Sequence, residues 1–377
     1  MHQTSHDKND KNTIQPIVST SIEHLDQIPL AETLLAWYDQ HKRDLPWRNT
    51  TDPYTIWISE IILQQTRVEQ GLGYFVRFME RFPDIQSVAV ASEQEILNYW
   101  KGLGYYGRAR NIHHAARLVM EQFEGKFPTQ YDEIRSLPGI GPYTAAAIAS
   151  FAFHLPYPVI DGNVMRFLTR YFGIFNTIDE AETKKTINQL AMDLMDKQHP
   201  DLYNQAIMEF GALQCVPHSP SCAQCPFQGS CFAAANQMVN QFPIKKKKLQ
   251  PRDRYFYYFC MVHEQTVLLQ KRINKDIWQH LYEFPLLETP EPLAVEKVLA
   301  SPFLQSYVPF QVEYISSPVK HLLTHQKIYA IFFIIRTDRQ LPSDQHHPAV
   351  RVDQLIHYPI PKLIISFINS VLLKQSY

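Results

Sequence analysis

The hydrophobic pattern of this chain changes its period near residue 250. From about residue 28 to residue 235, apolar residues recur every three or four positions between Pro and Gly interruptions, which predicts helices. The first helix is expected to begin near Ile28 and to run through Leu34–Tyr38. Later segments rich in β-branched and aromatic residues predict strands, with a closing helix after Pro361. These predicted strands are Tyr255–Val262, Val267–Gln270, Phe310–Ile315 and Ile328–Ile335.

The pattern divides the chain of 377 residues into two domains, each long enough to bury a core. Residues 1–24 read as a polar tail and residues 25–235 as an all-α domain. A basic linker over residues 236–253 contains the run Lys245–Lys248. Residues 254–377 are predicted to form an α+β domain.

Composition narrows the class of protein only slightly. With 36 Lys and Arg against 37 Asp and Glu, the formal net charge is −1, so an affinity for nucleic acid would have to rest on local patches. No apolar run approaches the roughly 18 residues of a membrane span, and the polar start lacks a signal-peptide core. We therefore expect a cytoplasmic protein without a membrane segment.

Two glycines and a later aspartate form the first candidate constellation. Gly139 and Gly141 in Leu137–Tyr143 permit a tight turn, and the following segment reads as a helix whose first amides suit a phosphate oxygen. Asp161 follows the predicted end of that helix, so a short loop could return a carboxylate towards this backbone. The alternative is a plain turn that ends one helix and begins the next.

Glu60 is the second candidate, because it lies in a predicted helix among Trp57, Ile61 and Ile62. Desolvation there would raise its pKa and keep it protonated near neutral pH, as a general acid requires. Alternatively, it is a surface charge on the polar side of an amphipathic helix.

Four of the five cysteines fall within residues 215–231, which indicates a metal site rather than disulfide bonds. The number of thiolates suits either tetrahedral zinc or a [4Fe–4S] cluster. A separate segment, residues 96–120, contains basic residues and no acidic ones. It could bind a phosphate backbone or be a solvated helix face. Its basic residues are Lys101, Arg108, Arg110 and Arg117.

The string Leu137–Tyr143 with Asp161 resembles the signature of helix-hairpin-helix base-excision DNA glycosylases. Glu60 followed by Leu63–Thr66 (Leu-Gln-Gln-Thr) resembles one subfamily, the MutY adenine DNA glycosylases, from about residue 28 onward. The resemblance implies an all-α glycosylase domain with an iron–sulfur loop and a C-terminal α+β Nudix-like domain. The spacing of Cys215, Cys222, Cys225 and Cys231 matches that loop and implies a [4Fe–4S] cluster.

The same resemblance implies a role for each matching residue. Glu60 would protonate adenine, and Asp161 would stabilise the sugar cation, with Tyr143 and Asn163 positioning the site. Because related endonuclease III enzymes have a lysine at the position of Tyr143, and some MutY members have one at Met165, strand cleavage is expected to be weak or absent.

The residues implied to bind DNA are spread over both domains. All 12 glycines lie at or before Gly229, so the second domain lacks a Nudix pyrophosphatase motif and is expected only to bind. Gln65 and Tyr105 would insert into the base stack, and Arg48 and Glu209 would line the adenine pocket. Gly139 and Gly141 would approach the phosphates. Leu323, Thr324 and His325 would read 8-oxoguanine, in the place where the family has a Phe-Ser-His turn.

The resemblance therefore implies a monomeric, nucleoid-associated bacterial enzyme that removes adenine mispaired with 8-oxoguanine or guanine in double-stranded DNA. Two alternatives remain at this point. One is an endonuclease III-like glycosylase and lyase acting on oxidised pyrimidines, against which Tyr143 argues. The other is a non-catalytic mismatch sensor, against which Glu60 and Asp161 argue.

Overall fold

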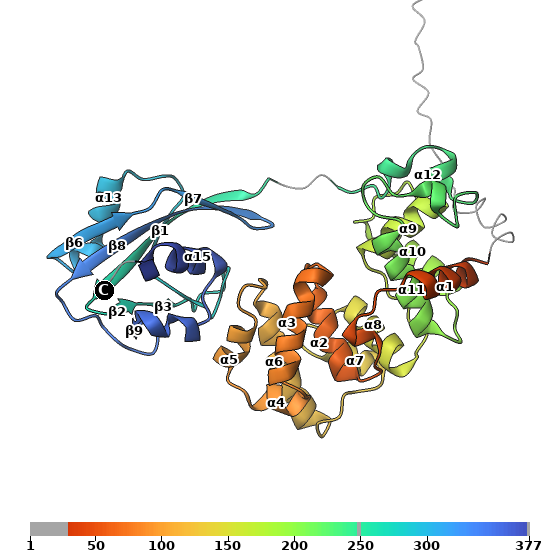
Figure 1. Ribbon diagram of the computed structural model, residues 1–377, viewed down its shortest axis with the longest axis horizontal. Coiled ribbons are helices and arrows are strands. Elements are labelled where there is room, and N and C mark those ends of the chain that lie inside the picture. Colours follow the sequence, from red (N-terminus) through yellow and green to blue (C-terminus); the bar gives the residue numbers. More distant parts are fainter. Residues whose placement is uncertain (1–28, 247–249, 375–377) are drawn as a thin grey trace, which may run out of the picture. The chain divides into compact units, whose positions relative to one another are not determined.

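The structure, a computed structural model, describes residues 29–246 and 250–374 (Figure 1). The predicted polar tail and the end of the lysine run lie outside the described residues. The chain divides into two compact units, and each is discontinuous in sequence. The first unit comprises Met1–Ile56, Thr129–Arg135 and Gly141–Lys247, and the second comprises Trp57–Pro128, Ser136–Ile140 and Lys248–Tyr377.

The first unit is helical throughout its described residues. Its main core lies between α1, α9 and α11, and α1 contributes Leu30, Leu34, Trp37 and Tyr38 at the three- and four-residue spacing of one helix face. The helices of this unit are α1 (Leu30–His41), α8 (Pro142–Phe153), α9 (Gly162–Phe172), α10 (Ala181–Leu194), α11 (Pro200–Leu213) and α12 (Phe232–Ala235), with 3₁₀ turns at Pro46–Arg48, Cys222–Gln224 and Val239–Gln241.

The second unit contains helices followed by a sheet. Two further helices, α2 (Pro53–Leu63) and α7 (Tyr131–Ser136), have residues in both units. Polar side chains fix where two of its helices begin. Asp84 forms a capping box with Ser87 at α4, and Ser92 accepts from the amide of Glu95 at α5. Its first helices are α3 (Val68–Arg81), α4 (Ile85–Val90), α5 (Glu93–Tyr99) and α6 (Gly107–Gln122).

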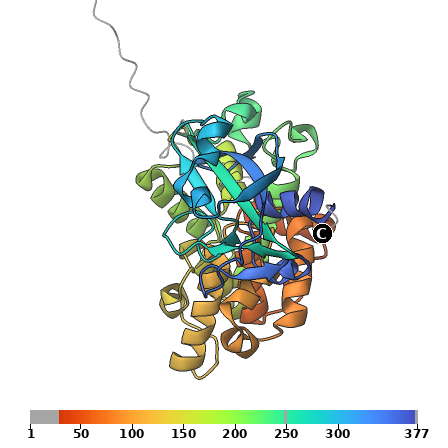
Figure 2. The same cartoon turned by 90° about the vertical axis from the view of Figure 1, so that its left-hand side faces the viewer.

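The seven-stranded sheet of the second unit is organised around two twelve-residue strands, β1 and β8. They are parallel and lie side by side, whereas the other pairs in this sheet are antiparallel (Figures 1 and 2). The path is β6-β8-β1-β2-β9, with β5 paired to β1 and β7 paired to β8. The strands are β1 (Arg252–His263), β2 (Thr266–Leu268), β5 (Leu286–Thr289), β6 (Phe310–Ile315), β7 (Val319–Leu322), β8 (Gln326–Thr337) and β9 (Ala349–Arg351), and a separate pair is formed by β3 (Gln270–Lys271) and β4 (Tyr282–Glu283).

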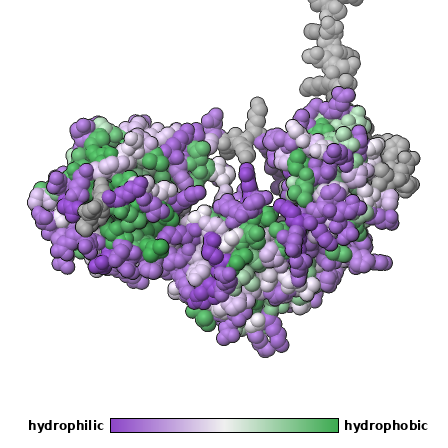
Figure 3. Space-filling model, in the orientation of Figure 1, coloured by the Kyte–Doolittle hydropathy of each residue, from purple (hydrophilic) through white to green (hydrophobic). Residues whose placement is uncertain are grey.

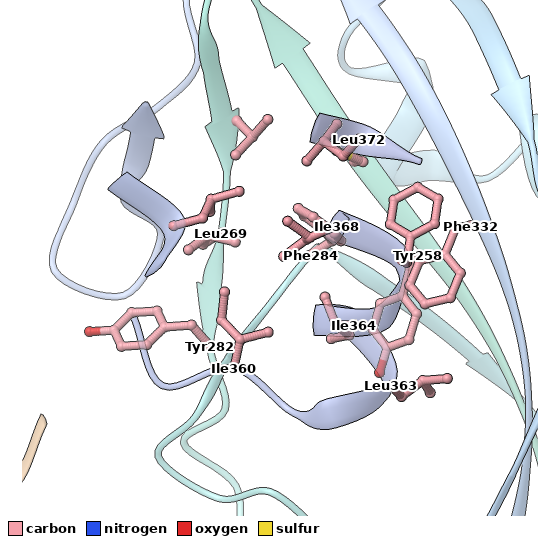
Figure 4. Packing of buried hydrophobic residues seen from close by; sticks show 14 of the residues in the cluster. Tyr258, Leu269, Tyr282, Phe284, Phe332, Ile360, Leu363, Ile364, Ile368 and Leu372 are labelled. Atoms are coloured by element: carbon pink, nitrogen blue, oxygen red, sulfur yellow. The ribbon is translucent and has the colours of Figure 1, made fainter. Parts of the chain in front are cut away.

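Strand β1 is buried on both faces, because alternate side chains enter different cores. Tyr258 and its alternate neighbours pack beneath α15 (Lys362–Ser370), as Figure 4 shows for Tyr258 and Ile364. The rings of Phe332 and Phe367 stack there at 4.3 Å. Phe259 points to the other face, towards α13 (Val295–Leu299) and α14 (Pro302–Gln305). Hydrophobic residues also gather on the surface that carries α15 (Figure 3). The last described elements are a 3₁₀ turn at Val352–His357, then α15, then a second 3₁₀ turn at Leu372–Lys374.

The fold class predicted from the sequence is confirmed. Each predicted strand segment forms one strand, or in one case two, and the closing helix follows Pro361. Between residues 29 and 246 the described chain contains helices and turns but no strand. Among all the described residues, no helix has both the length and the apolar character required to cross a bilayer. The proposed domain boundaries stay predictions.

Candidate functional site

Glu60 lies in α2 and is only 7% exposed. The helix is apolar on nearly all sides, and Trp57 and Ile61 beside Glu60 are at most 3% exposed. Burial of a carboxyl group in such a helix excludes the alternative of an ordinary surface charge. The expected burial of this carboxyl is therefore confirmed.

The turn between α7 and α8 depends on Gly139. Its φ is +79°, and a Cβ atom there would lie 2.6 Å from the Cβ of Asn111, so only glycine fits. Gly141 has an ordinary φ of −86° and is the N-cap of α8, with Pro142 as the first helical residue. The two glycines thus differ: Gly139 is required by backbone geometry, whereas Gly141 leaves open space at the helix start.

Asp161 is the N-cap of α9, the helix after the turn helix α8. Its Oδ1 accepts from the amides of Asn163 and Val164, both at 2.8 Å, and its Oδ2 accepts from Asn163 Nδ2 at 2.6 Å. Burial raises the pKa of Asp161 above its usual value, although these three hydrogen bonds favour the ionised form. The result is a rigidly oriented carboxyl group.

Arg166, one turn further along α9, connects the Asp161 turn to the cysteine loop. Its Nη2 donates to Asn163 Oδ1 at 2.8 Å, and its Nε donates to the carbonyl of Cys215 at 2.7 Å. Gly211 on α11 makes this close packing feasible, because a Cβ atom there would lie 2.7 Å from the Asn163 carbonyl oxygen. Sequence reasoning missed Arg166, which carries no signal apart from its position after Asp161.

Tyr143 lies in the first turn of α8 and is half-buried. It packs in a small cluster around Ala146 and Val159, together with Tyr131 and Tyr157, whose rings stack at 4.2 Å. The phenol is thus fixed by aromatic packing at the helix end that follows the glycine turn.

The four clustered cysteines line one pocket, whose remaining wall is partly aromatic. Arg170 on α9 reaches it, with Nη1 at 3.3 Å from Cys215 Sγ, and also donates to the carbonyls of Val216 and Pro217. Burial raises the pKa of the Cys225 thiol to about 11 and raises those of Cys215 and Cys231. The aromatic residues of this wall are Phe167, Phe210 and Phe227.

The chemistry of these four side chains fits a metal group. Four thiols gathered around one pocket are a donor set that suits an iron–sulfur cluster or a tetrahedral zinc ion. Among residues 29–246 and 250–374, no three His, Cys, Asp or Glu side chains are placed to ligate one metal ion.

Glu209 is bracketed by two arginines and is 1% exposed. Arg48 and Arg43 each approach both carboxylate oxygens, at 2.7 to 2.9 Å. Burial would raise the pKa of Glu209, but the hydrogen bonds from Arg48 and Arg43 outweigh burial and lower it to about 2. The predicted pocket residues Arg48 and Glu209 thus form an ion pair, and Arg43 is a third member that the sequence did not reveal.

Gln65 and Tyr105 both occupy loops with left-handed backbone, at φ values of +57° and +48°. Such conformations are costly for residues other than glycine and are concentrated at functional sites. Arg108 supports both loops, because its guanidinium donates to the carbonyls of Gln64 and Gly104 and lies over the Tyr105 ring. Burial lowers the pKa of Arg108 to about 10.

Leu323, Thr324 and His325 form the tight turn between β7 and β8. Leu323 packs against the core beneath α15, while the exposed apolar side chain beside the turn is Leu322, at 64% exposure. Within the second unit, the hydroxyls of Thr324 and Tyr105 are hydrogen-bonded at 2.7 Å. Two residues predicted from distant parts of the sequence to bind DNA therefore meet.

The basic segment over residues 96–120 differs from the expectation. Arg108 caps α2 and Arg110 donates to the carbonyl of Gln279 at 2.6 Å, while Lys101 donates to the carbonyl of Ile356 at 3.2 Å. Their partners are carbonyl oxygens of the second unit, at the C-terminal end of α2, in the loop before β4 and in the 3₁₀ turn at Val352–His357. Arg117 alone of the four is exposed without a hydrogen bond or ion pair to the described residues.

Comparison with known proteins agrees with this arrangement. Residues 58–193 match the family of HhH-GPD superfamily base excision DNA repair proteins, and residues 257–370 match the NUDIX domain family. Similar curated proteins include the adenine DNA glycosylases of Buchnera aphidicola from Acyrthosiphon pisum, 35% identical over 69% of this chain and 75% of that protein, and of Rattus norvegicus, 32% identical over 84% and 72%.

A solved structure of a thermostable thymine-DNA glycosylase is also similar. It is 29% identical with a TM-score of 0.51, and the match covers 55% of this chain and 95% of that one. The fold match therefore covers a complete glycosylase domain, and the relatives extend the match across most of the chain. The chain belongs to the adenine DNA glycosylase family of the HhH-GPD superfamily.

Proposed function

We propose that this protein removes adenine from double-stranded DNA where it is mispaired with 8-oxoguanine and, less efficiently, with guanine, and leaves an abasic site. Membership of the adenine DNA glycosylase family supports the reaction. The observation that carries the proposal is the buried Glu60 carboxyl in α2. Burial desolvates a carboxyl group, and desolvation favours the protonated form, which a general acid needs.

In the proposed mechanism, the adenine is first turned out of the duplex, which costs least at a mispair. Glu60 then donates its proton to a ring nitrogen of adenine, and the N-glycosidic bond breaks as the base leaves as a neutral molecule. The sugar that remains carries oxocarbenium character, as in glycoside hydrolysis. Water attacks the anomeric carbon and completes the hydrolysis.

Asp161 is proposed to stabilise this sugar cation in its ionised form. The two backbone amides and Asn163 Nδ2 fix both carboxylate oxygens, so that little reorganisation is needed when positive charge develops. Tyr143 has no amine that could form a Schiff base with the opened sugar. We therefore propose hydrolysis without strong strand cleavage.

Lesion recognition is proposed to use both loops of the second unit that meet at Tyr105 and Thr324. Tyr105 and Gln65 would fill the space left by the extruded base, and the hydroxyl of Thr324 with the imidazole of His325 would read the edge of 8-oxoguanine. Gly139 and Gly141 would allow the backbone to approach a phosphate, and Arg48 and Glu209 would border the adenine pocket. The protein is proposed to act as a monomer.

The proposed function is tested by single-turnover base release from duplexes that contain 8-oxoguanine:A, G:A or an oxidised pyrimidine, each analysed with and without alkali. We expect rapid adenine loss opposite 8-oxoguanine, slower loss opposite guanine, and strand scission only after alkali. Scission of the pyrimidine duplex without alkali would indicate an endonuclease III-like lyase. Tight binding of the mispair without adenine release would indicate a mismatch sensor.

We further propose that Cys215, Cys222, Cys225 and Cys231 hold a [4Fe–4S] cluster, which would crosslink the loop over residues 215–231 and stabilise its fold. A Cys225→Ser variant is expected to lose most of its iron and acid-labile sulfide, and with them the visible absorption of the cluster. Cys260→Ala is the matched control, because Cys260 is fully buried in β1, and it should retain the iron. Zinc in place of iron in the wild-type protein would contradict the assignment.

A further inference from the structure

The loop between β3 and β4, residues 272–281, is held at its base by a network of ion pairs. We call it the β3–β4 loop. Arg254 on β1, 7% exposed, donates to both oxygens of Asp276 at 3.0 and 2.7 Å and to both oxygens of Glu288 at 2.7 Å. Arg272 donates to Asp276 Oδ2 at 2.8 Å. Two guanidinium groups thus hold Asp276, and these ion pairs fix the orientation of the β3–β4 loop relative to the sheet.

The outer part of the same loop is strained. Trp278 and His280 have φ values of +57° and +69°, and a left-handed backbone is unfavourable for a residue as bulky as tryptophan, although histidine adopts it more readily. Backbone hydrogen bonds close the neck, with the His280 amide donating to the Arg272 carbonyl at 2.7 Å. Strain of this kind persists only where the surrounding contacts outweigh its cost.

Those contacts come partly from β7, the strand that precedes the turn carrying Thr324. The Trp278 ring packs near Phe256 and lies 5.8 Å from the ring of His321. His321 is on β7, which leads directly into the turn containing Thr324. The position of the β3–β4 loop therefore affects the position of the β7–β8 turn.

The other contacts of the loop are made with α5 and α6, in the same unit. Arg110 on α6 donates to the Gln279 carbonyl at 2.6 Å, and His280 Nδ1 lies 2.6 Å from Glu93 Oε1 at the start of α5. Tyr105 lies two positions before the first residue of α6 and is hydrogen-bonded to the Thr324 hydroxyl. The segment before α6 thus contacts the β7–β8 turn directly, through Tyr105. Arg110, within α6, is connected to the same turn only through the β3–β4 loop.

We propose that Arg110 is a positioning residue for discrimination of 8-oxoguanine from guanine, which acts by holding the β3–β4 loop and, through Trp278 and His321, the turn that presents Thr324. This inference rests on the proposed function. Arg110 comes from the basic segment that the sequence offered as a phosphate-binding patch. Its hydrogen bonds to the backbone and side chain of Gln279 assign it an internal role instead.

The test compares adenine release from 8-oxoguanine:A and G:A duplexes under single-turnover conditions. Arg110→Ala is expected to lower the preference for 8-oxoguanine about tenfold, the factor that one charge-assisted hydrogen bond is worth, with the rate on G:A unchanged. If Arg110 acts only through the turn, combining Arg110→Ala with Thr324→Ala should lower the preference no further than Thr324→Ala alone. Arg117→Ala is the matched control on the same helix, because Arg117 is exposed, and it should retain the preference.

Two results would overturn the inference. One is an unchanged preference in Arg110→Ala. The other is an equal loss on both duplexes with a salt dependence reduced by about one charge, as expected for a lost phosphate contact. If Arg110→Ala does not fold, His280→Ala removes the neighbouring contact to Glu93 and should cause a loss of the same kind. Absence of adenine release by the wild-type protein would instead reject the proposed function.

Discussion

A Glu60→Gln variant is expected to bind mispaired DNA like the wild-type protein but to release adenine about 10²–10⁴-fold more slowly. Glutamine has the shape of a protonated glutamic acid and keeps the packing in α2, where Glu60 is 7% exposed. Its amide cannot transfer a proton to the departing base. Binding therefore survives in this variant, whereas the chemical step loses its acid.

The measurement is single-turnover adenine release combined with a binding titration on the same duplex. Glu80→Gln on α3 is the matched control, because Glu80 is exposed on a neighbouring helix and should leave both quantities unchanged. Near wild-type turnover in Glu60→Gln would remove Glu60 from the mechanism. Loss of binding together with turnover would show that the residue acts on the fold or on DNA affinity instead.

A Glu209→Ala variant is expected to lower the free energy of unfolding by about 3–5 kcal/mol, the usual cost of removing one partner from a buried ion pair. The change leaves Arg48, whose side chain is 14% exposed, and Arg43 without the carboxylate that each of them contacts through both oxygens. For a unit of this size, such a loss corresponds to a melting temperature lower by roughly 6–20 °C.

The difference in free energy of unfolding between the wild-type protein and Glu209→Ala is also expected to depend on pH. The pKa of Glu209 falls from an ordinary value of 4.5 to about 2 in the folded protein. A carboxyl group whose pKa is lower in the folded state stabilises the fold at every pH above its pKa in the unfolded state. This stabilisation is lost as the pH falls through the pKa of the folded state. The gap in stability should therefore be full above pH 4.5 and should shrink between pH 4.5 and about pH 2.

Thermal unfolding monitored by circular dichroism across this pH range measures the effect. Glu182→Ala in the first turn of α10 serves as the control, because Glu182 is exposed and its removal should change stability by less than about 0.5 kcal/mol. Adenine release well below the melting temperature then separates the two roles of Glu209. If Glu209→Ala is as stable as the wild-type protein but releases adenine slowly, Glu209 contributes more to the adenine pocket than to the stability of the fold.

The sequence by itself determined the features that depend on neighbours along the chain. Helical and strand periods set the order of the elements, Gly139 provides the left-handed turn, and Asp161 caps the helix that begins beside it. The apolar neighbours of Glu60 within one helix also predicted its burial. In each case the atoms that decide the outcome lie within a few residues of one another.

Only the tertiary structure decided what the arginines do. Arg108 and Arg110 appeared suited to DNA phosphates, yet Arg108 holds the carbonyls of Gln64 and Gly104 and Arg110 holds that of Gln279. Arg43 gave no signal, because Glu209, which it binds, is far away in sequence. Arg166 binds Asn163 nearby, but its other partner, the carbonyl of Cys215, is also distant in sequence. A guanidinium group donates equally well to a phosphate, a carboxylate or a carbonyl oxygen, so its partner is set by which oxygen the folded chain brings within reach.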